Sequence, residues 1–302
     1  MNILKSLAIT ILTFILFLSL ALFGTVFALN STLLNPDFVA NHVDKLDMSL
    51  LAQELLKGQA SGQSSVETEF LEEAIYMTID EQEPWIKEQM RAVVYAGYDY
   101  FLGKSEKMSL MVSMEPFKES LRDNLWQIFQ QDLDKLPPEF ATAPQSMLES
   151  YFDEFYQQFA GEIPSEIRVD ESAVPPEVMA QIILVRQYVS YNQMLYYGLI
   201  GLMVLLVLAI IFLRRSVKGA TRELGITFLI YGIIEYAGVW ATRNFMPTSL
   251  PLLDIPSSLQ PWLTGLIRDF VAPLEIFSIG LMAGGAVLII VSIVYRPRRV
   301  EE

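Results

Sequence analysis

The chain has 302 residues, of which 52% are hydrophobic, and its mean hydropathy of +0.36 is too high for an ordinary soluble domain. Its formal net charge is −14 and it has no cysteine, which excludes disulfides, thiolate catalysis and cysteine-ligated metals. A single histidine, His42, cannot supply a paired-histidine metal or haem site, and too few Lys and Arg cluster to bind nucleic acid. We therefore expect a membrane protein without a metal or cofactor.

The first 29 residues are predicted to form a membrane span. Residues 6–29 carry no charge and exceed the 7–15 apolar residues typical of a signal peptide, which favours an uncleaved anchor. A cleaved signal peptide is the alternative, because Val26-Phe27-Ala28 suits a small-residue cleavage site.

Residues 30–190 are predicted to form one acidic, mostly helical domain outside the cytoplasm. This stretch holds 28 Asp and Glu against 11 Lys and Arg. Apolar stripes at helical spacing predict several helices. They include 36–57, 83–102 and 116–136, together with helices that begin near residues 64 and 146. Such stripes are typical of a protein core, so we assign them no ligand.

Two short segments of this domain alternate apolar and polar residues, as strands do. They are residues 108–114 and 166–170, and we expect them to pair as a small β ribbon. Further along, Pro176 suits the first turn of a helix, and no strong breaker follows it until about residue 213. One continuous helix over 176–213 is therefore expected to lead into the second span.

Three further spans complete a predicted four-helix transmembrane bundle, so the expected fold class is mainly α with a large domain inserted after the first span. Beyond 1–29 and 30–190, the predicted segments are a second span at 191–213, a basic cytoplasmic loop at 214–224, a third span at 225–242, an outer loop at 243–269, a fourth span at 270–295 and a cytoplasmic tail at 296–302.

The orientation follows from the basic residues near the span ends, because Lys and Arg accumulate in cytoplasmic loops. With four crossings they all fall on one side, which places both termini in the cytoplasm and the acidic domain outside the cell membrane. These topology residues are Lys5, Arg214, Arg215, Lys218, Arg222, Arg296, Arg298 and Arg299.

Two acidic residues lie within predicted spans. Glu235 is in the third span and Glu275 is near the start of the fourth, at comparable depths in the outer leaflet. A charge inside a bilayer costs roughly 2.5–3.5 kcal/mol on insertion scales, so each needs a partner or a function. If the two face each other they form a proton or cation site. The structural alternative is that Glu275 caps a helix start and Glu235 pairs with a Tyr or Arg, with Arg243 or Arg268 as the counter-charge.

Glycines in the last two spans indicate close helix packing. Gly280 and Gly284 are four residues apart in the fourth span, and Gly232 and Gly238 in the third span offer a matching groove. Packing within the bundle is one interpretation, and a homodimer face is the other.

Two functions remain open. The first is a non-enzymatic membrane protein whose outer domain binds a protein partner or a ligand, as a scaffold, assembly factor or sensor. The second is a small proton- or cation-linked transporter or channel subunit that uses Glu235 and Glu275. Four spans are few for a transporter monomer, and the chain lacks evident repeats, so the second function would require an oligomer.

Overall fold

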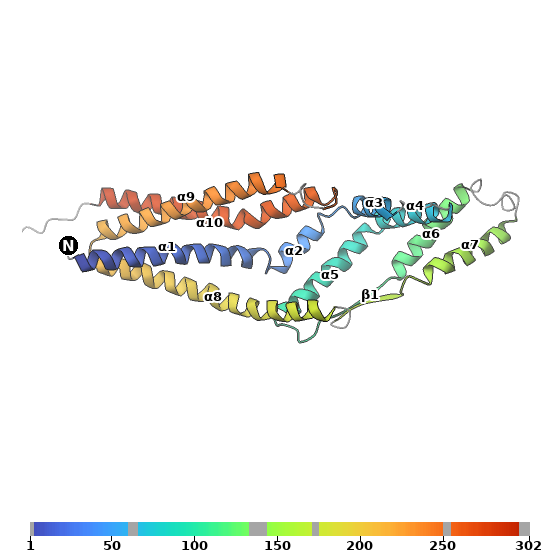
Figure 1. The fold of residues 1–302 in the computed structure, drawn as a ribbon, viewed down its shortest axis with the longest axis horizontal. Helices are drawn as coiled ribbons and strands as arrows, with labels where there is room; N and C mark the ends of the chain where they lie inside the picture. Colours follow the sequence, from blue (N-terminus) through green and yellow to red (C-terminus); the bar gives the residue numbers. More distant parts are fainter. Residues whose placement is uncertain (1–2, 60–65, 133–143, 171–174, 250–254, 296–302) are drawn as a thin grey trace, which may run out of the picture. The chain divides into compact units, whose positions relative to one another are not determined.

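The protein is described here by a computed structural model that covers residues 3–59, 66–132, 144–170, 175–249 and 255–295. Within these residues it has ten helices and two strands, so it is mainly α as expected (Figure 1). Contacts divide the chain into two units. We call residues 1–39, 184–254 and 263–302 the bundle unit, and residues 40–183 and 255–262 the inserted unit.

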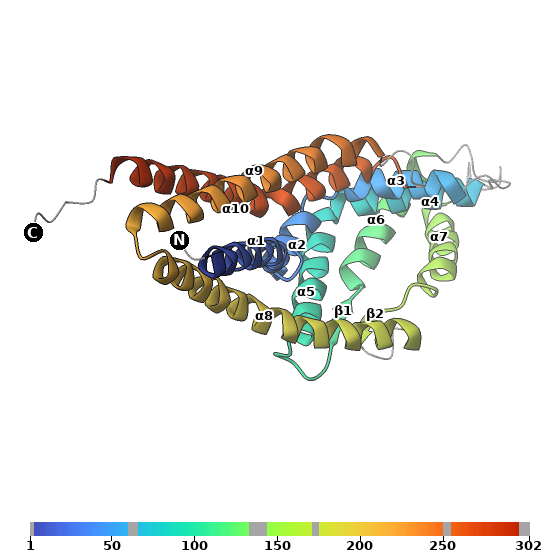
Figure 2. The ribbon, with the colours of Figure 1, turned by 60° about the vertical axis from the view of Figure 1, so that its left-hand side comes forward.

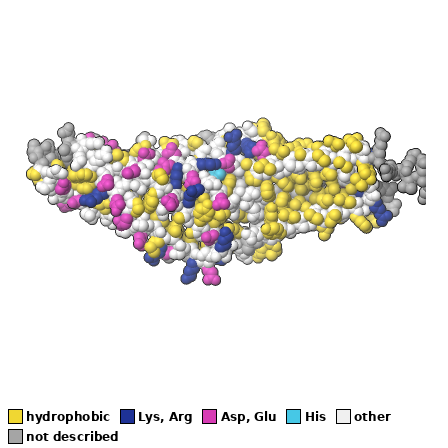
Figure 3. All heavy atoms as spheres, turned by 180° about the vertical axis from the view of Figure 1, so that it is seen from behind, with side chains coloured by type: hydrophobic (Ala, Val, Ile, Leu, Met, Phe, Trp, Pro, Cys, Tyr) yellow, Lys and Arg dark blue, Asp and Glu magenta, His cyan; other side chains and the backbone are white. Residues whose placement is uncertain are grey.

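Four helices supply the bundle unit, and each is long and apolar enough to cross a membrane. They are α1 (Ile3–Ser31), α8 (Pro176–Arg214), α9 (Val217–Ser249) and α10 (Gln260–Val294), of which residues 176–183 and 260–262 belong to the inserted unit. Hydrophobic side chains cover the surface of this unit, as expected for helices in contact with lipid (Figure 3). The four predicted spans are thus all found as helices.

The bundle has an apolar core to which all four helices contribute. Leu16 and Leu20 of α1 and Leu206 and Ile210 of α8 are buried in it, and Phe277 of α10 packs against it. At its centre, the buried ring of Tyr231 lies edge-to-face against Phe17, with ring centroids 5.4 Å apart.

The helix boundaries differ from those predicted by hydropathy. α10 begins at Gln260 rather than at residue 270, and α9 runs from Val217 to Ser249 rather than over 225–242. The predicted basic loop at 214–224 is therefore mostly helix, and only Arg215 and Ser216 separate α8 from α9. Arg215 has the left-handed φ of 52°, and the Ser216 hydroxyl accepts a hydrogen bond from the Gly219 N–H, which starts α9.

α8 is one continuous helix from Pro176 to Arg214, as the absence of a breaker predicted. Its 39 residues give a length of roughly 58 Å at 1.5 Å per residue. α9 and α10 lie side by side along the bundle, as Figure 2 shows, and their backbones meet at Gly225 and Gly285.

The inserted unit contains the remaining elements. They are α2 (Pro36–Val43), α3 (Met48–Gln59), α4 (Val66–Glu81), α5 (Glu83–Phe101), β1 (Ser109–Ser113), α6 (Glu115–Gln131), α7 (Gln145–Ala160) and β2 (Glu166–Asp170). The helix predicted over 36–57 is in fact two, because the Asp47 carboxylate accepts a hydrogen bond from the Leu50 N–H at 2.8 Å and starts a new helix there.

The β ribbon forms as the alternation predicted. β1 and β2 are antiparallel, with Val112 opposite Ile167 and Leu110 opposite Val169. Beside it, α4, α6 and α7 form the core of the inserted unit. Buried side chains of this core are Phe70, Ala74, Leu121, Leu125, Ile128, Phe129, Phe152, Phe155, Tyr156 and Ala160. The apolar stripes of α4, α6 and α7 therefore lie in the core, as predicted.

Candidate functional site

Glu275 is held by an ion pair inside the bundle. Its Oε2 lies 2.5 Å from Nη1 of Arg243, at the end of α9, and both side chains are about three-quarters buried. Arg243 is therefore the counter-charge to Glu275, whereas Arg268 lies two turns earlier on α10 itself. The prediction that Glu275 caps a helix start is wrong, because α10 begins at Gln260 and Glu275 lies 15 residues further along it. The carboxylate instead joins α10 to α9 through Arg243.

Glu235 has a different environment, formed by neutral groups. Its Oε2 accepts a hydrogen bond of 2.9 Å from the hydroxyl of Tyr231, one turn earlier on α9. On α1, Gly24 leaves room for both groups. A Cβ at position 24 would lie 3.0 Å from the Tyr231 hydroxyl oxygen and 3.5 Å from Oε1 of Glu235. The carboxyl group thus lies at the contact of α1 with α9.

Glu235 and Glu275 have different partners: Tyr231 donates a hydrogen bond to Glu235, and Arg243 forms an ion pair with Glu275. A proton or cation site shared by Glu235 and Glu275 stays a prediction.

The glycines at the α9–α10 contact are only partly those predicted. A Cβ on Gly232 would lie 2.8 Å from the Ser278 carbonyl oxygen, so this glycine is required for close packing. The prediction that Gly238, Gly280 and Gly284 allow close helix packing is wrong within the described residues, because a Cβ at each would have no atom within 4 Å. Successive residues of a helix face different directions, and it is Gly285, the residue after Gly284, that faces α9.

The predicted topology residues lie at the ends of bundle helices where they are described. Lys5 is in the first turn of α1, Arg215 joins α8 to α9, and Lys218 and Arg222 are in the first turns of α9. Arg214 forms an ion pair with Glu223, an acid that the charge pattern alone had left without a role. Arg296, Arg298 and Arg299 lie outside the described residues.

The turn that precedes α10 belongs to the inserted unit and is held there by a carboxylate. Oε1 of Glu54 accepts hydrogen bonds from the N–H and hydroxyl of Ser257, at 2.8 and 3.1 Å, and Oε2 accepts one from the Ser258 N–H at 2.8 Å. The Ser258 side chain and the backbone N–H groups of Ser258 and Ser257 lower the pKa of Glu54 to about 2.

A second hydrogen bond ties the same segment to α2. The indole N–H of Trp262 donates to the carbonyl oxygen of His42 at 2.7 Å. His42 is buried, and it is its backbone carbonyl that accepts this bond. These contacts bring together residues more than 200 positions apart in the sequence, which no local pattern could predict.

The inserted unit contains an open apolar groove of about 560 Å³. α3 and α5 form two of its walls, and the β ribbon forms another. Its lining residues are Met48, Leu51, Ala52, Leu55, Ile79, Trp85, Ile86, Gln89, Met90, Val93, Val94, Val112, Met114, Phe117, Ile167 and Val169. Gln89 is the one polar side chain among them, and none is charged.

Local spacing explains how the groove is built. Met48, Leu51, Ala52 and Leu55 follow the i, i+3, i+4, i+7 pattern that places side chains on one face of a helix. The prediction that the stripes over 36–57 and 83–102 are core is incomplete, because residues of both line this open groove. Leu55 is 53% exposed, because no further layer of the described chain covers this face.

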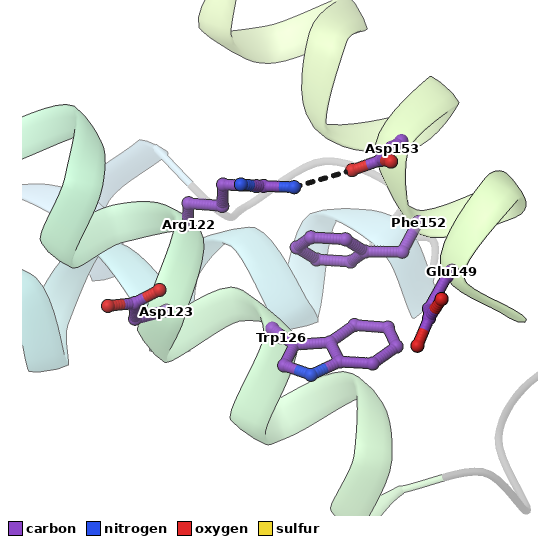
Figure 4. A pocket seen from close by; sticks show the side chains of 6 residues that line it. All are labelled: Arg122, Asp123, Trp126, Glu149, Phe152 and Asp153. Carbon is purple, nitrogen blue, oxygen red and sulfur yellow. Dashed lines mark hydrogen bonds and ion pairs between the residues drawn. The ribbon is translucent and has the colours of Figure 1, made fainter. Parts of the chain in front are cut away.

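A second, smaller hollow of about 320 Å³ lies between α6 and α7 (Figure 4). Trp126 and Phe152 pack edge-to-face in its wall with ring centroids 4.7 Å apart, and Arg122 pairs with Asp153 beside them at 2.8 Å. Both members of that ion pair are more than half exposed. This hollow is a solvated surface feature above the core, and it offers a ligand much less apolar contact than the groove does.

No family model, no curated protein and no solved structure matches this chain. Function must therefore be argued from the geometry of the groove and of the bundle.

Proposed function

We propose that the protein is a membrane-anchored, non-enzymatic binding protein whose inserted unit takes up an apolar ligand in the groove between α3, α5 and the β ribbon. The observation that carries this proposal is the lining, in which Gln89 is the one polar side chain in a hollow of about 560 Å³. Natural ligand sites have volumes of about 300–1,000 Å³ and mostly apolar walls. Large exposed apolar patches on domains that contact water commonly mark binding sites.

The groove suits binding better than catalysis. General acid–base and nucleophilic mechanisms need a titratable or nucleophilic side chain within hydrogen-bonding reach of the substrate. Gln89 has neither property, and the other lining residues are aliphatic, aromatic or methionine. Roles as a scaffold, an assembly factor or a sensor all fit a ligand-binding domain, and each would involve a protein partner. The predicted cytoplasmic segments are short, so a sensor would need that partner to transmit a signal.

We further propose that the inserted unit lies outside the cell membrane, with both termini in the cytoplasm. The positions of Lys5, Arg214, Arg215, Lys218 and Arg222 at one set of helix ends support this orientation. The hydrogen bonds of Glu54 and His42 to residues 257–262 also support it, because they require the α9–α10 connection and the inserted unit to share one side of the membrane.

Binding of a naphthylamine probe, which becomes fluorescent in apolar surroundings, tests the proposed function. The full chain in lipid nanodiscs is compared with empty nanodiscs at the same free probe concentration. We expect saturable excess fluorescence that falls at least tenfold in Ala52→Phe, because the larger ring fills the groove. Met147→Phe is the matched control, since Met147 is exposed on α7 and is not a lining residue. Equal fluorescence with and without the protein would refute the proposal.

The alternative function, a proton- or cation-linked transporter or channel subunit, has one observation in its favour. Glu235 receives its hydrogen bond from a neutral phenol rather than from a cation, whereas Glu275 is paired with Arg243. Flux into liposomes that contain the purified protein would discriminate the two functions. Transport that is abolished by Glu235→Gln and retained in Glu275→Gln would favour the alternative.

A further inference from the structure

We propose that the ligand of the groove is a single unbranched aliphatic chain, carried by a lipid whose head remains outside the groove. This identification rests on the proposed function, because it names the ligand class of the same site. Three observations support it: the volume, the lining and the surrounding charge.

The volume matches one long chain. If a methylene takes about as much room as a water molecule in the liquid, roughly 30 Å³, then 560 Å³ corresponds to about 18 methylenes. A second chain of the same length would have no room. The geometry therefore points to a lipid with one chain of about 16–18 carbons rather than to a two-chain phospholipid.

The lining excludes the polar part of such a molecule. A buried polar group without a hydrogen-bond partner is costly, and the groove offers only the amide of Gln89. Any charged or heavily hydroxylated head must therefore stay in water. Met48, Met90 and Met114 line the groove, and their unbranched, flexible side chains adapt to a chain that has no fixed shape. A rigid ring system would need a more fixed surface.

The groove is too small to enclose a partner helix. An α-helix with its side chains is about 10 Å across, so 560 Å³ would hold roughly 7 Å of its length, or about five residues. An extended peptide fits no better, because its backbone N–H and C=O groups would lack partners along the apolar walls. A methylene chain has neither restriction.

The surrounding charge favours a head without net negative charge. Residues 30–190 hold 28 acids and 11 bases. The excess belongs to this whole stretch rather than to the edge of the groove, because Glu83 of α5 is paired with Lys87 and Glu54 of α3 is bound by Ser257 and Ser258. A carboxylate head would be repelled by this field, whereas a zwitterionic head would not. A single-chain zwitterionic lipid is thus preferred over a free fatty acid of equal length.

The experiment measures uptake of lysophosphatidylcholines with 10 to 20 chain carbons by the full chain in nanodiscs. Uptake is corrected for empty nanodiscs at the same free aqueous concentration. We expect affinity to rise about fourfold per added methylene, the value for complete burial, and to level off near 16–18 carbons. The Ala52→Phe variant should level off at a shorter chain, and Met147→Phe should behave as the wild type does. The fatty acid of equal length should bind more weakly.

Trp85 lines the groove and reports where the chain lies. A lysolipid brominated in mid-chain should quench wild-type fluorescence more than that of Trp85→Phe, and the difference should be lost in Ala52→Phe. Two results would overturn this inference while the proposed function stands. In the first, the naphthylamine probe binds but the affinity for lysolipids does not depend on their chain length. In the second, a sterol or an amphipathic helical peptide displaces the probe more strongly than a lysolipid does. If the probe itself does not bind, the proposed function fails.

Discussion

Among single residues, Glu54 has the most clearly determined electrostatic role. Its carboxylate accepts hydrogen bonds from Ser257 and Ser258, which lower its pKa from 4.5 to about 2. The folded state therefore favours the ionised form. The resulting stabilisation is fully present above about pH 4.5 and is lost as the pH falls from 4.5 toward 2.

We predict that Glu54→Gln lowers the unfolding temperature of the full chain at pH 7 and that its difference from the wild type disappears as the pH approaches 2. Thermal unfolding in nanodiscs across this range measures the effect. Glu88→Gln on α5 is the control, because Glu88 is an exposed acid outside this contact. A difference for Glu54→Gln that stays constant from pH 7 to pH 2 would contradict the assigned role.

At the scale of helices, two neighbouring glycines of α10 provide a matched pair. A Cβ on Gly285 would lie 2.7 Å from the Gly225 carbonyl oxygen and 2.8 Å from the Leu229 nitrogen, both of which are backbone atoms of α9. A Cβ on Gly284 would meet nothing within 4 Å. The first contact cannot be relieved by a side-chain rotation, so the helices themselves would have to separate.

We predict that Gly285→Ala destabilises the protein by about 1–3 kcal/mol, the usual cost of overpacking. Gly284→Ala should be neutral or stabilising by up to about 1 kcal/mol, because alanine favours a helix over glycine. Denaturant unfolding in mixed micelles measures both variants. Equal effects would show that the α9–α10 contact is not as close as described. A change of oligomeric state confined to Gly284→Leu would instead support the homodimer face expected from the sequence.

Helix-scale patterns predicted most of the elements. Hydropathy located all four bundle helices, and alternation, partial in 108–114 and regular in 166–170, located both strands of the ribbon. Helix ends were less predictable, because hydropathy marks the apolar stretch rather than the hydrogen-bonded helix. Gln260 starts α10 within a polar turn that Glu54 binds, and Asp47 starts α3 in the middle of an apolar stripe. Such starts depend on single side chains, some of them distant in sequence.

The candidate site was less predictable than the fold. Glu235, Glu275 and Arg243 stood out in the sequence because charges are rare in apolar spans, and the Arg243–Glu275 pair is present. The groove did not stand out, because a stripe such as Met48–Leu55 looks the same whether a neighbouring helix covers it or not. Only the tertiary arrangement decides this, and it leaves Leu55 and Ile167 uncovered among the described residues.

For the molecule as a whole, the sidedness of the membrane is the central prediction. The contacts of residues 257–262 with Glu54 and His42 require the α9–α10 connection to share a side with the inserted unit. α8 and α9 separate these two regions, so both helices cross the bilayer or neither does. Because α8 and α9 are long and apolar enough to cross, one pair of positions suffices to determine the orientation.

Because the chain has no cysteine, a single introduced cysteine is the only thiol that a maleimide can label. We predict that Ser150→Cys, at an exposed position of α7, reacts with a membrane-impermeant maleimide in intact cells. Val217→Cys, exposed beside the α8–α9 link, should react only after the cells are permeabilised. The physical reason for this expectation is the cluster of basic residues around that link, because Lys and Arg accumulate in cytoplasmic loops. The opposite labelling pattern would place the groove in the cytoplasm, where its lipid would have to come from the inner leaflet. If both positions react in intact cells, α8 and α9 do not both cross the membrane.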